Sequence, residues 1–152
     1  PNVGKSSLIA AISSGKPEIK SYPFTTKGVS LGHIKVKYDI IQVMDTPGLL
    51  DRPDTERNDM EKQGIAALEH LEPVIVFLTD LSGTSGYSIE IQTALHDELK
   101  DRYSNYSWLD VYSKSDLEPD FSLDYPNSIS VSVMDATGIE ALESELVRIC
   151  KL

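Results

Sequence analysis

Two kinds of apolar spacing succeed one another along this chain. Segments with apolar residues at three- and four-residue intervals are predicted to be helices, namely 5–14, 58–71, 88–103 and the segment that follows Thr137. Short apolar or alternating segments are predicted to be strands, namely 33–38, 40–44, 74–78, 108–112 and 128–133. Helices that interleave with apolar strands predict an α/β three-layer sandwich around a mostly parallel sheet.

Finer expectations follow from the same spacing. Ile34, Val36 and Tyr38 should share one face of a strand that pairs antiparallel with 40–44. The order Thr137-Gly138-Ile139-Glu140 has the pattern of a capping box at a helix start. The helix 88–103 should bury one stripe of residues spaced four apart: Ile91, Leu95, Leu99 and Tyr103.

Composition limits where the protein works and what it binds. The 152 residues suffice for one domain, and 14 Lys and Arg against 24 Asp and Glu give a net charge of −10. This charge argues against tight binding of nucleic acid by the domain itself, because phosphate neutralisation needs clustered basic residues. A single cysteine, Cys150, favours a reducing compartment. The run 74–78 is far below the roughly 18 residues of a membrane span, and no signal peptide is visible, so a soluble, cytoplasmic protein is expected.

The chain opens with Pro-Asn-Val-Gly-Lys-Ser-Ser, directly before the first predicted helix. Gly4 would let the backbone approach phosphates, Lys5 would reach the β- and γ-phosphates, and Ser6 would bind magnesium. The loop predicted to contact the nucleotide also includes Asn2, Val3 and Ser7. A chance Gly-Lys-Ser at a helix start is the alternative, and the later motifs weigh against it.

Two further segments are typical of a nucleotide-sensing loop. Asp45 follows the strand 40–44 and would hold magnesium, while the amide of Gly48 would meet the γ-phosphate. In the loop before it, Thr26 would place its hydroxyl on magnesium and its amide on the γ-phosphate, with Thr25 as the alternative. Lys5, Thr26 and Gly48 are therefore the predicted catalytic residues.

A third motif, Ser113-Lys114-Ser115-Asp116, follows the strand 108–112. GTPases carry an Asn-Lys-x-Asp pattern at this place, and the resemblance implies that the Asp116 carboxylate accepts hydrogen bonds from the ring N–H and amino group of guanine, which adenine cannot offer. It also implies that the stem of Lys114 packs over the base. Ser113 stands where GTPases have asparagine. A segment on or just past the last strand stands where GTPases carry Ser-Ala-x, whose backbone touches the guanine oxygen: Ser132, Val133 and Met134.

These motifs together resemble the Obg-like branch of P-loop GTPases. The relevant runs are Pro-Asn-Val-Gly-Lys-Ser-Ser, Tyr-Pro-Phe-Thr-Thr-Lys-Gly and Asp-Thr-Pro-Gly-Leu-Leu-Asp-Arg-Pro. Asp80-Leu81-Ser82, Gly86-Tyr87-Ser88-Ile89-Glu90 and Gln92 resemble the nucleolar GTP-binding protein family and its archaeal relatives. The resemblance implies a protein that binds GTP or GDP with Mg²⁺, hydrolyses GTP slowly and acts in assembly of the large ribosomal subunit, in the nucleolus if eukaryotic.

The resemblance also implies a Ras-like fold without its first strand. Residues 1–152 would be one GTPase domain, truncated at its N-terminus inside the P-loop, and the absent strand would lie centrally between 40–45 and 74–78. Three readings of function stay open: a GTP-hydrolysing switch, which is favoured, a GTP-binding module that docks on ribosomal precursors without hydrolysis, and a P-loop ATPase. Ser113 alone favours the ATPase, and Asp116 opposes it.

The residue after Gly48 concerns the mechanism. Leu49 stands where Ras-like enzymes place a glutamine that orients the attacking water, so slow intrinsic turnover is expected. In related GTPases an asparagine at the position of Asn2 helps to hold K⁺ beside the phosphates. Asn2 either does the same here or only shapes the loop.

Overall fold

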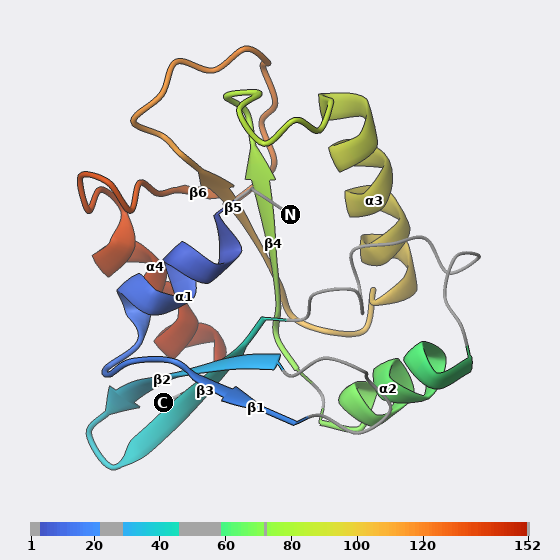
Figure 1. Cartoon of the computed structure of the whole chain (residues 1–152), viewed down its shortest axis with the longest axis vertical. Coiled ribbons are helices and arrows are strands. Elements are labelled where there is room, and N and C mark those ends of the chain that lie inside the picture. Colours follow the sequence, from blue (N-terminus) through green and yellow to red (C-terminus); the bar gives the residue numbers. More distant parts are fainter. Residues whose placement is uncertain (1–3, 22–28, 46–58, 72, 152) are drawn as a thin grey trace.

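The computed structural model describes residues 4–21, 29–45, 59–71 and 73–151 (Figure 1). The four predicted helices are present as α1 (Lys5–Ile12), α2 (Asp59–Glu69), α3 (Ile89–Arg102) and α4 (Ile139–Ile149). The five predicted strands are present as β2 (Val29–Val36), β3 (Asp39–Met44), β4 (Ile75–Asp80), β5 (Trp108–Ser113) and β6 (Ile129–Ser130). One short strand, β1 (Glu18–Lys20), was not predicted, because its three residues are all exposed and show no alternation.

The described strands form two three-stranded sheets. Antiparallel pairs join β1, β2 and β3, whereas β4, β5 and β6 pair in parallel. The predicted pairing of β2 with β3 is confirmed, since Val36 lies opposite Asp39. One detail was wrong: Tyr38 does not share a face with Ile34 but is fully exposed in the turn, next to Lys37 with φ +51°.

Two helix predictions need correction at the level of side chains. Ser88 caps α3 by accepting a hydrogen bond from the amide of Ile91 at 3.2 Å. Because of where that cap starts the helix, Ile91 is 58% exposed and the buried face of α3 includes Gln92 instead. The predicted capping box is also wrong: α4 begins after Gly138, and no side chain caps it.

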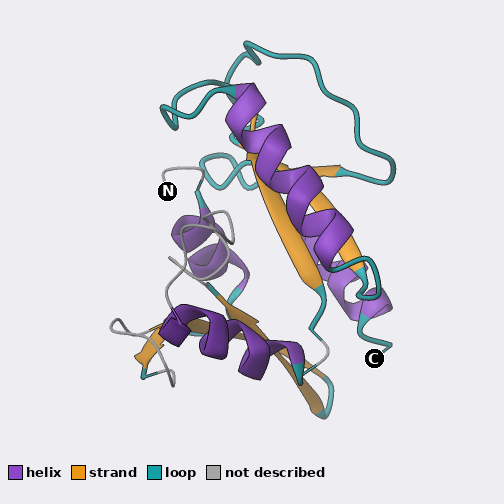
Figure 2. Cartoon of the chain, turned by 90° about the vertical axis from the view of Figure 1, so that its right-hand side faces the viewer, coloured by secondary structure: helices purple, strands orange, loops and turns teal. Residues whose placement is uncertain are grey.

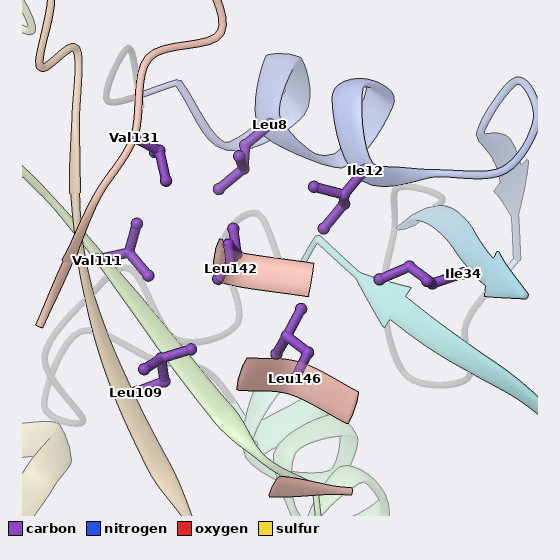
Figure 3. Packing of buried hydrophobic residues seen from close by; sticks show 8 residues of the cluster. All are labelled: Leu8, Ile12, Ile34, Leu109, Val111, Val131, Leu142 and Leu146. Carbon is purple, nitrogen blue, oxygen red and sulfur yellow. The ribbon is translucent and has the colours of Figure 1, made fainter. Parts of the chain in front are cut away.

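Helices cover both sides of the parallel sheet. On one side α1 and α4 lie next to each other (Figure 1), and their apolar faces meet residues of both sheets in one core cluster (Figure 3). That cluster comprises Leu8, Ile12, Ile34, Leu109, Val111, Val131, Leu142 and Leu146. On the other side α3 lies over β4 and β5 (Figure 2), and a second cluster combines Ile65, Ile75, Leu99 and Tyr103. The first cluster therefore ties the two sheets together.

His96 of α3 belongs to this second side and is buried among polar and aromatic partners. Its Nε2 lies 2.7 Å from a carboxylate oxygen of Asp110, and its Nδ1 lies 3.0 Å from Asp97. Its ring stacks on Tyr125 at 4.0 Å. Burial, with Asp97 and Asp110 nearby, raises the pKa of Tyr125 to about 12. His96 is thus a satisfied interior histidine, and the described residues contain no group of three His, Cys, Asp or Glu side chains placed to hold a metal.

A cavity of about 460 Å³ separates the facing edges of β3 and β4. Within the described ranges no hydrogen-bonded ladder joins these two strands. The lining is mainly apolar and comes from α1, β2, β3, β4 and α4. Val76 of β4 is 38% exposed although it belongs to an apolar run.

Candidate functional site

The N-terminal end of α1 carries the first group of predicted site residues. Gly4 precedes the helix with φ +100°, a conformation that other residues rarely adopt. Lys5 and Ser6 form the first turn, and both reach the end of β3: the Lys5 ammonium lies 3.5 Å from Asp45 Oδ1, and the Ser6 hydroxyl donates to Asp45 Oδ2 at 3.2 Å. Ser7 is exposed on the same turn. The structure thus brings together Lys5, Ser6 and Asp45, which are some 40 positions apart in the sequence.

Asp45 is held rigidly at the end of β3. Its amide donates to the carbonyl of Ser30 at 3.0 Å, and the residue is only 7% exposed. Within the described part of the chain its Oδ1 accepts no hydrogen bond, although the Lys5 ammonium lies within ion-pairing distance. A buried carboxylate oxygen without a donor, beside a serine hydroxyl, is a donor set that suits Mg²⁺ when phosphates and water complete the coordination. Ser6 and Asp45 therefore fit the implied magnesium.

The third motif begins at the end of β5, close to the P-loop. A Cβ on Gly4 would lie 4.0 Å from the Cβ of Ser113, which places the two motifs side by side. Ser113 is buried, and its hydroxyl donates to the carbonyl of Thr79 at 3.5 Å. Lys114 has φ +55°, and its ammonium lies 3.3 Å from Asp80 and 2.7 Å from the Thr84 hydroxyl. The serine that replaces asparagine thus contacts β4 backbone.

Asp116 and the loop after β6 form the last part of the site. The hydroxyl of Ser132, which is fully buried, donates to Asp116 Oδ1 at 2.8 Å. Asp116 itself is exposed. Val133 and Met134 are 40% and 85% exposed, so only the backbone of this loop is anchored. One anchor is a hydrogen bond of 2.9 Å from the Ser132 amide to the Thr137 carbonyl.

Several predicted residues lie outside the described ranges. Asn2 and Val3 of the opening loop are among them, as are Thr26 and Gly48. Their predicted roles stay predictions. The described members come from the start of α1, from the ends of β3 and β5 and from the loop after β6.

Sequence reasoning missed the role of the β4 end. Asp80 and Gln92 entered only as markers of a family, yet both are buried and hydrogen-bonded next to Lys114. An aspartate at the end of an apolar strand, followed by serines and a glycine, was the available signal in the sequence. Gly138 was also missed, because it was read as part of a capping box.

Comparisons with known proteins show which family the chain is similar to. The family described as Nucleolar GTP-binding protein 1 matches residues 59–116. Nucleolar GTP-binding protein 1 of Eremothecium gossypii is 38% identical over 148 residues, which is 97% of this chain and 23% of that protein. An uncharacterized protein of Methanocaldococcus jannaschii is 52% identical over 103 residues, 68% of this chain and 28% of that protein. The chain thus spans about a quarter of the length of these curated relatives. No helix among the described residues is long and apolar enough to cross a membrane.

Solved structures give the same result for the fold. The G domain of Thermotoga maritima FeoB superposes with a TM-score of 0.69 at 20% identity, covering 99% of this chain and 93% of that one, and so supports the fold alone. A Plasmodium falciparum protein assigned as a nucleolar GTP-binding protein 1 superposes with a TM-score of 0.81 at 31% identity, covering 99% of this chain and 80% of that one. The predicted α/β P-loop GTPase fold is confirmed, and the chain belongs to the nucleolar GTP-binding protein 1 family.

Proposed function

We propose that this chain binds guanine nucleotide together with Mg²⁺ and hydrolyses GTP to GDP as a slow molecular switch. The observation that carries the proposal is the convergence of Lys5 and Ser6 on Asp45 at the start of α1. The membership in a family named for GTP binding supports the choice of nucleotide. The acceptor geometry of Asp116, fixed by Ser132, supports guanine over adenine.

The residues of the site would divide the work between binding and charge stabilisation. The amides at the N-terminus of α1 would point at the phosphates, and the Lys5 ammonium would offset charge on their oxygens. Ser6 and Asp45 would hold Mg²⁺, which when bound neutralises charge on the β- and γ-phosphates. The amide of Gly48 and the hydroxyl and amide of Thr26 would close over the γ-phosphate, as the sequence predicts.

In the cell we assign this activity to assembly of the large ribosomal subunit, in the nucleolus of a eukaryote or in the cytoplasm otherwise. Relatives that are named nucleolar proteins support this assignment. A net charge of −10 favours contact with ribosomal proteins over direct, tight binding of RNA by this domain. The second candidate is a module that docks with GTP bound but without hydrolysis. Measurable turnover would exclude it.

Calorimetry and phosphate release on the same preparation test the proposal. The protein is expected to bind GDP and GTP in the presence of Mg²⁺ more tightly than ADP and ATP, and to release phosphate from GTP slowly. Lys5→Ala should abolish nucleotide binding, because the ammonium group that would contact the phosphates is lost. The exposed surface of the protein should hardly change. Binding without release of phosphate would favour the docking module, and equal binding of adenine nucleotides would contradict the guanine assignment.

The choice of monovalent ion is the next prediction. Leu49 has no group to orient water, so hydrolysis should be faster in K⁺ than in Na⁺ at equal ionic strength if Asn2 helps to hold that ion beside the phosphates. Asn2→Ala should then remove the difference and leave the rate in Na⁺ unchanged. Equal hydrolysis rates in K⁺ and in Na⁺ would contradict the K⁺ site and leave Asn2 only the role of shaping the loop.

A further inference from the structure

Asp80, at the end of β4, is a completely buried carboxylate with four donors. The amide and hydroxyl of Ser82 donate to Oδ1 at 2.9 and 2.6 Å, and the Ser85 amide and Lys114 ammonium donate to Oδ2 at 2.9 and 3.3 Å. Burial alone would raise the pKa of Asp80, but the hydrogen bonds from Ser82, Lys114 and Ser85 outweigh it and hold that pKa below its ordinary value. The side chain is therefore an anion fixed in one position.

The backbone of Asp80 is fixed as firmly as its side chain. The side-chain amide of Gln92 on α3 accepts from the Asp80 amide at 2.8 Å and donates to the Asp80 carbonyl at 3.0 Å. The same nitrogen lies 3.2 Å from the carbonyl of Tyr87. Residues 81–88 therefore fold back on the end of β4, and the Asp80 carboxylate has a fixed place relative to both the sheet and α3.

The Asp80 carboxylate contacts Lys114, the lysine of the motif 113–116 that is proposed to bind guanine. The Lys114 ammonium contacts Asp80 Oδ2 and, at 2.7 Å, the hydroxyl of Thr84, which lies 2.9 Å from the hydroxyl of Ser82. Lys114 also has a left-handed backbone, with φ +55°. The backbone therefore fixes where the side chain begins, and the contacts of the ammonium group fix where it ends. A lysine stem loses much of its rotamer freedom when it is ordered, and here that ordering is in place before any ligand arrives.

We propose that Asp80 is a positioning residue for guanine nucleotide binding, which acts by anchoring the Lys114 ammonium so that the stem of Lys114 packs over the base. The inference rests on the proposed function and extends the binding machinery to residues 80–85 and to Gln92 of α3. Asp80 itself does not touch the nucleotide. Its effect should therefore pass through Lys114 and leave the phosphate contacts of Lys5 unchanged.

Replacing the charge while keeping the shape tests this role. Asp80→Asn in the full chain should weaken GDP binding roughly tenfold, because a charge-assisted hydrogen bond to Lys114 is lost. Asp110→Asn is the matched control: Asp110 is 3% exposed on the neighbouring strand but contacts His96 and Trp108. It should lower the thermal midpoint comparably and leave GDP affinity within twofold of the unmutated chain.

A second background separates positioning from general damage. Lys114→Met removes the ammonium group that Asp80 contacts. Adding Asp80→Asn to this variant should therefore cause no further loss of GDP affinity. If Asp80→Asn does not fold, Thr84→Val replaces it, since Thr84 is exposed and its hydroxyl also contacts Lys114. Its expected loss is about threefold, absent again in Lys114→Met.

The outcomes can be told apart. Losses that multiply in the double variant, or unchanged GDP affinity in a folded Asp80→Asn, would overturn the positioning role while the proposed function stands. No GDP binding by the unmutated chain would overturn the proposed function and this inference together.

Discussion

Asp116→Ala is expected to erase the preference for guanine over adenine nucleotides. Asp116 offers two carboxylate oxygens, one of which is held by the Ser132 hydroxyl at 2.8 Å, and only guanine presents two donors to such a pair. Losing hydrogen bonds to a charged group costs about 1–3 kcal/mol, so GDP affinity should fall tenfold or more. ADP affinity should hardly change. Competition between fluorescent GDP and either unlabelled nucleotide measures both values.

Glu118→Ala is the matched control for this change. Glu118 is exposed two residues further along the same loop, so its removal alters the net charge equally. It should retain the preference. A variant at Asp116 that still selects guanine would place the recognition of the base elsewhere.

Gly138→Ala is expected to cause a large loss of stability. Gly138 has φ +75°, and an added Cβ would lie 2.0 Å from the carbonyl oxygen of Ser130. The left-handed backbone costs a non-glycine residue roughly 1–2 kcal/mol, and forcing the β6 backbone aside adds about 1–3 kcal/mol. A total on the order of 2–5 kcal/mol should appear as a lower midpoint in urea unfolding. Guanine affinity should fall as well, since this backbone carries Ser132.

Gly86→Ala separates the two causes. Gly86 also has a left-handed backbone, with φ +83°, but nothing lies within 4 Å of an added Cβ. This variant should lose only the conformational part, roughly 1–2 kcal/mol. Equal losses of stability in Gly138→Ala and Gly86→Ala would show that the close approach of the added methyl group to Ser130 does not destabilise the protein.

The helices and strands could be predicted because their apolar periodicity is strong, while their caps and edges could not. The β2–β3 hairpin followed from alternation that ends near Asp39. Strand β1 gave no such signal, since an edge strand with every residue exposed needs no pattern. Thr137 was expected to cap α4, but the residue directly before this helix is Gly138. The loop requires a left-handed backbone there, which glycine adopts readily. A glycine inside a cap pattern is ambiguous until its partner strand is known.

The candidate site divides in the same way. The proximity of Lys5 and Ser6 to Asp45 could be anticipated because the first two stand at a helix start and the third at a strand end, positions that the fold brings together. The contacts of Asp80 could not, because a residue's burial depends on which loop closes over it. The replacement of asparagine by Ser113 was visible, but its contact with the Thr79 carbonyl required the register of β4 against β5.

The division of the strands into two sheets has a consequence for the order in which the chain folds. Strands β2 and β3 are joined by a two-residue turn, and hairpins of this kind close within about 1–10 μs. Strands β4 and β5 pair only after the crossover through α3 is in place, and such non-local pairing is slower. Helix α4 lies after all of these elements, and its Leu142 and Leu146 fill the core between α1, β2 and β5. The early hairpin therefore waits for α4 before both sheets share one core, and until then its apolar side chains that belong to this core, such as Ile34, stay open to contact with other unfolded chains.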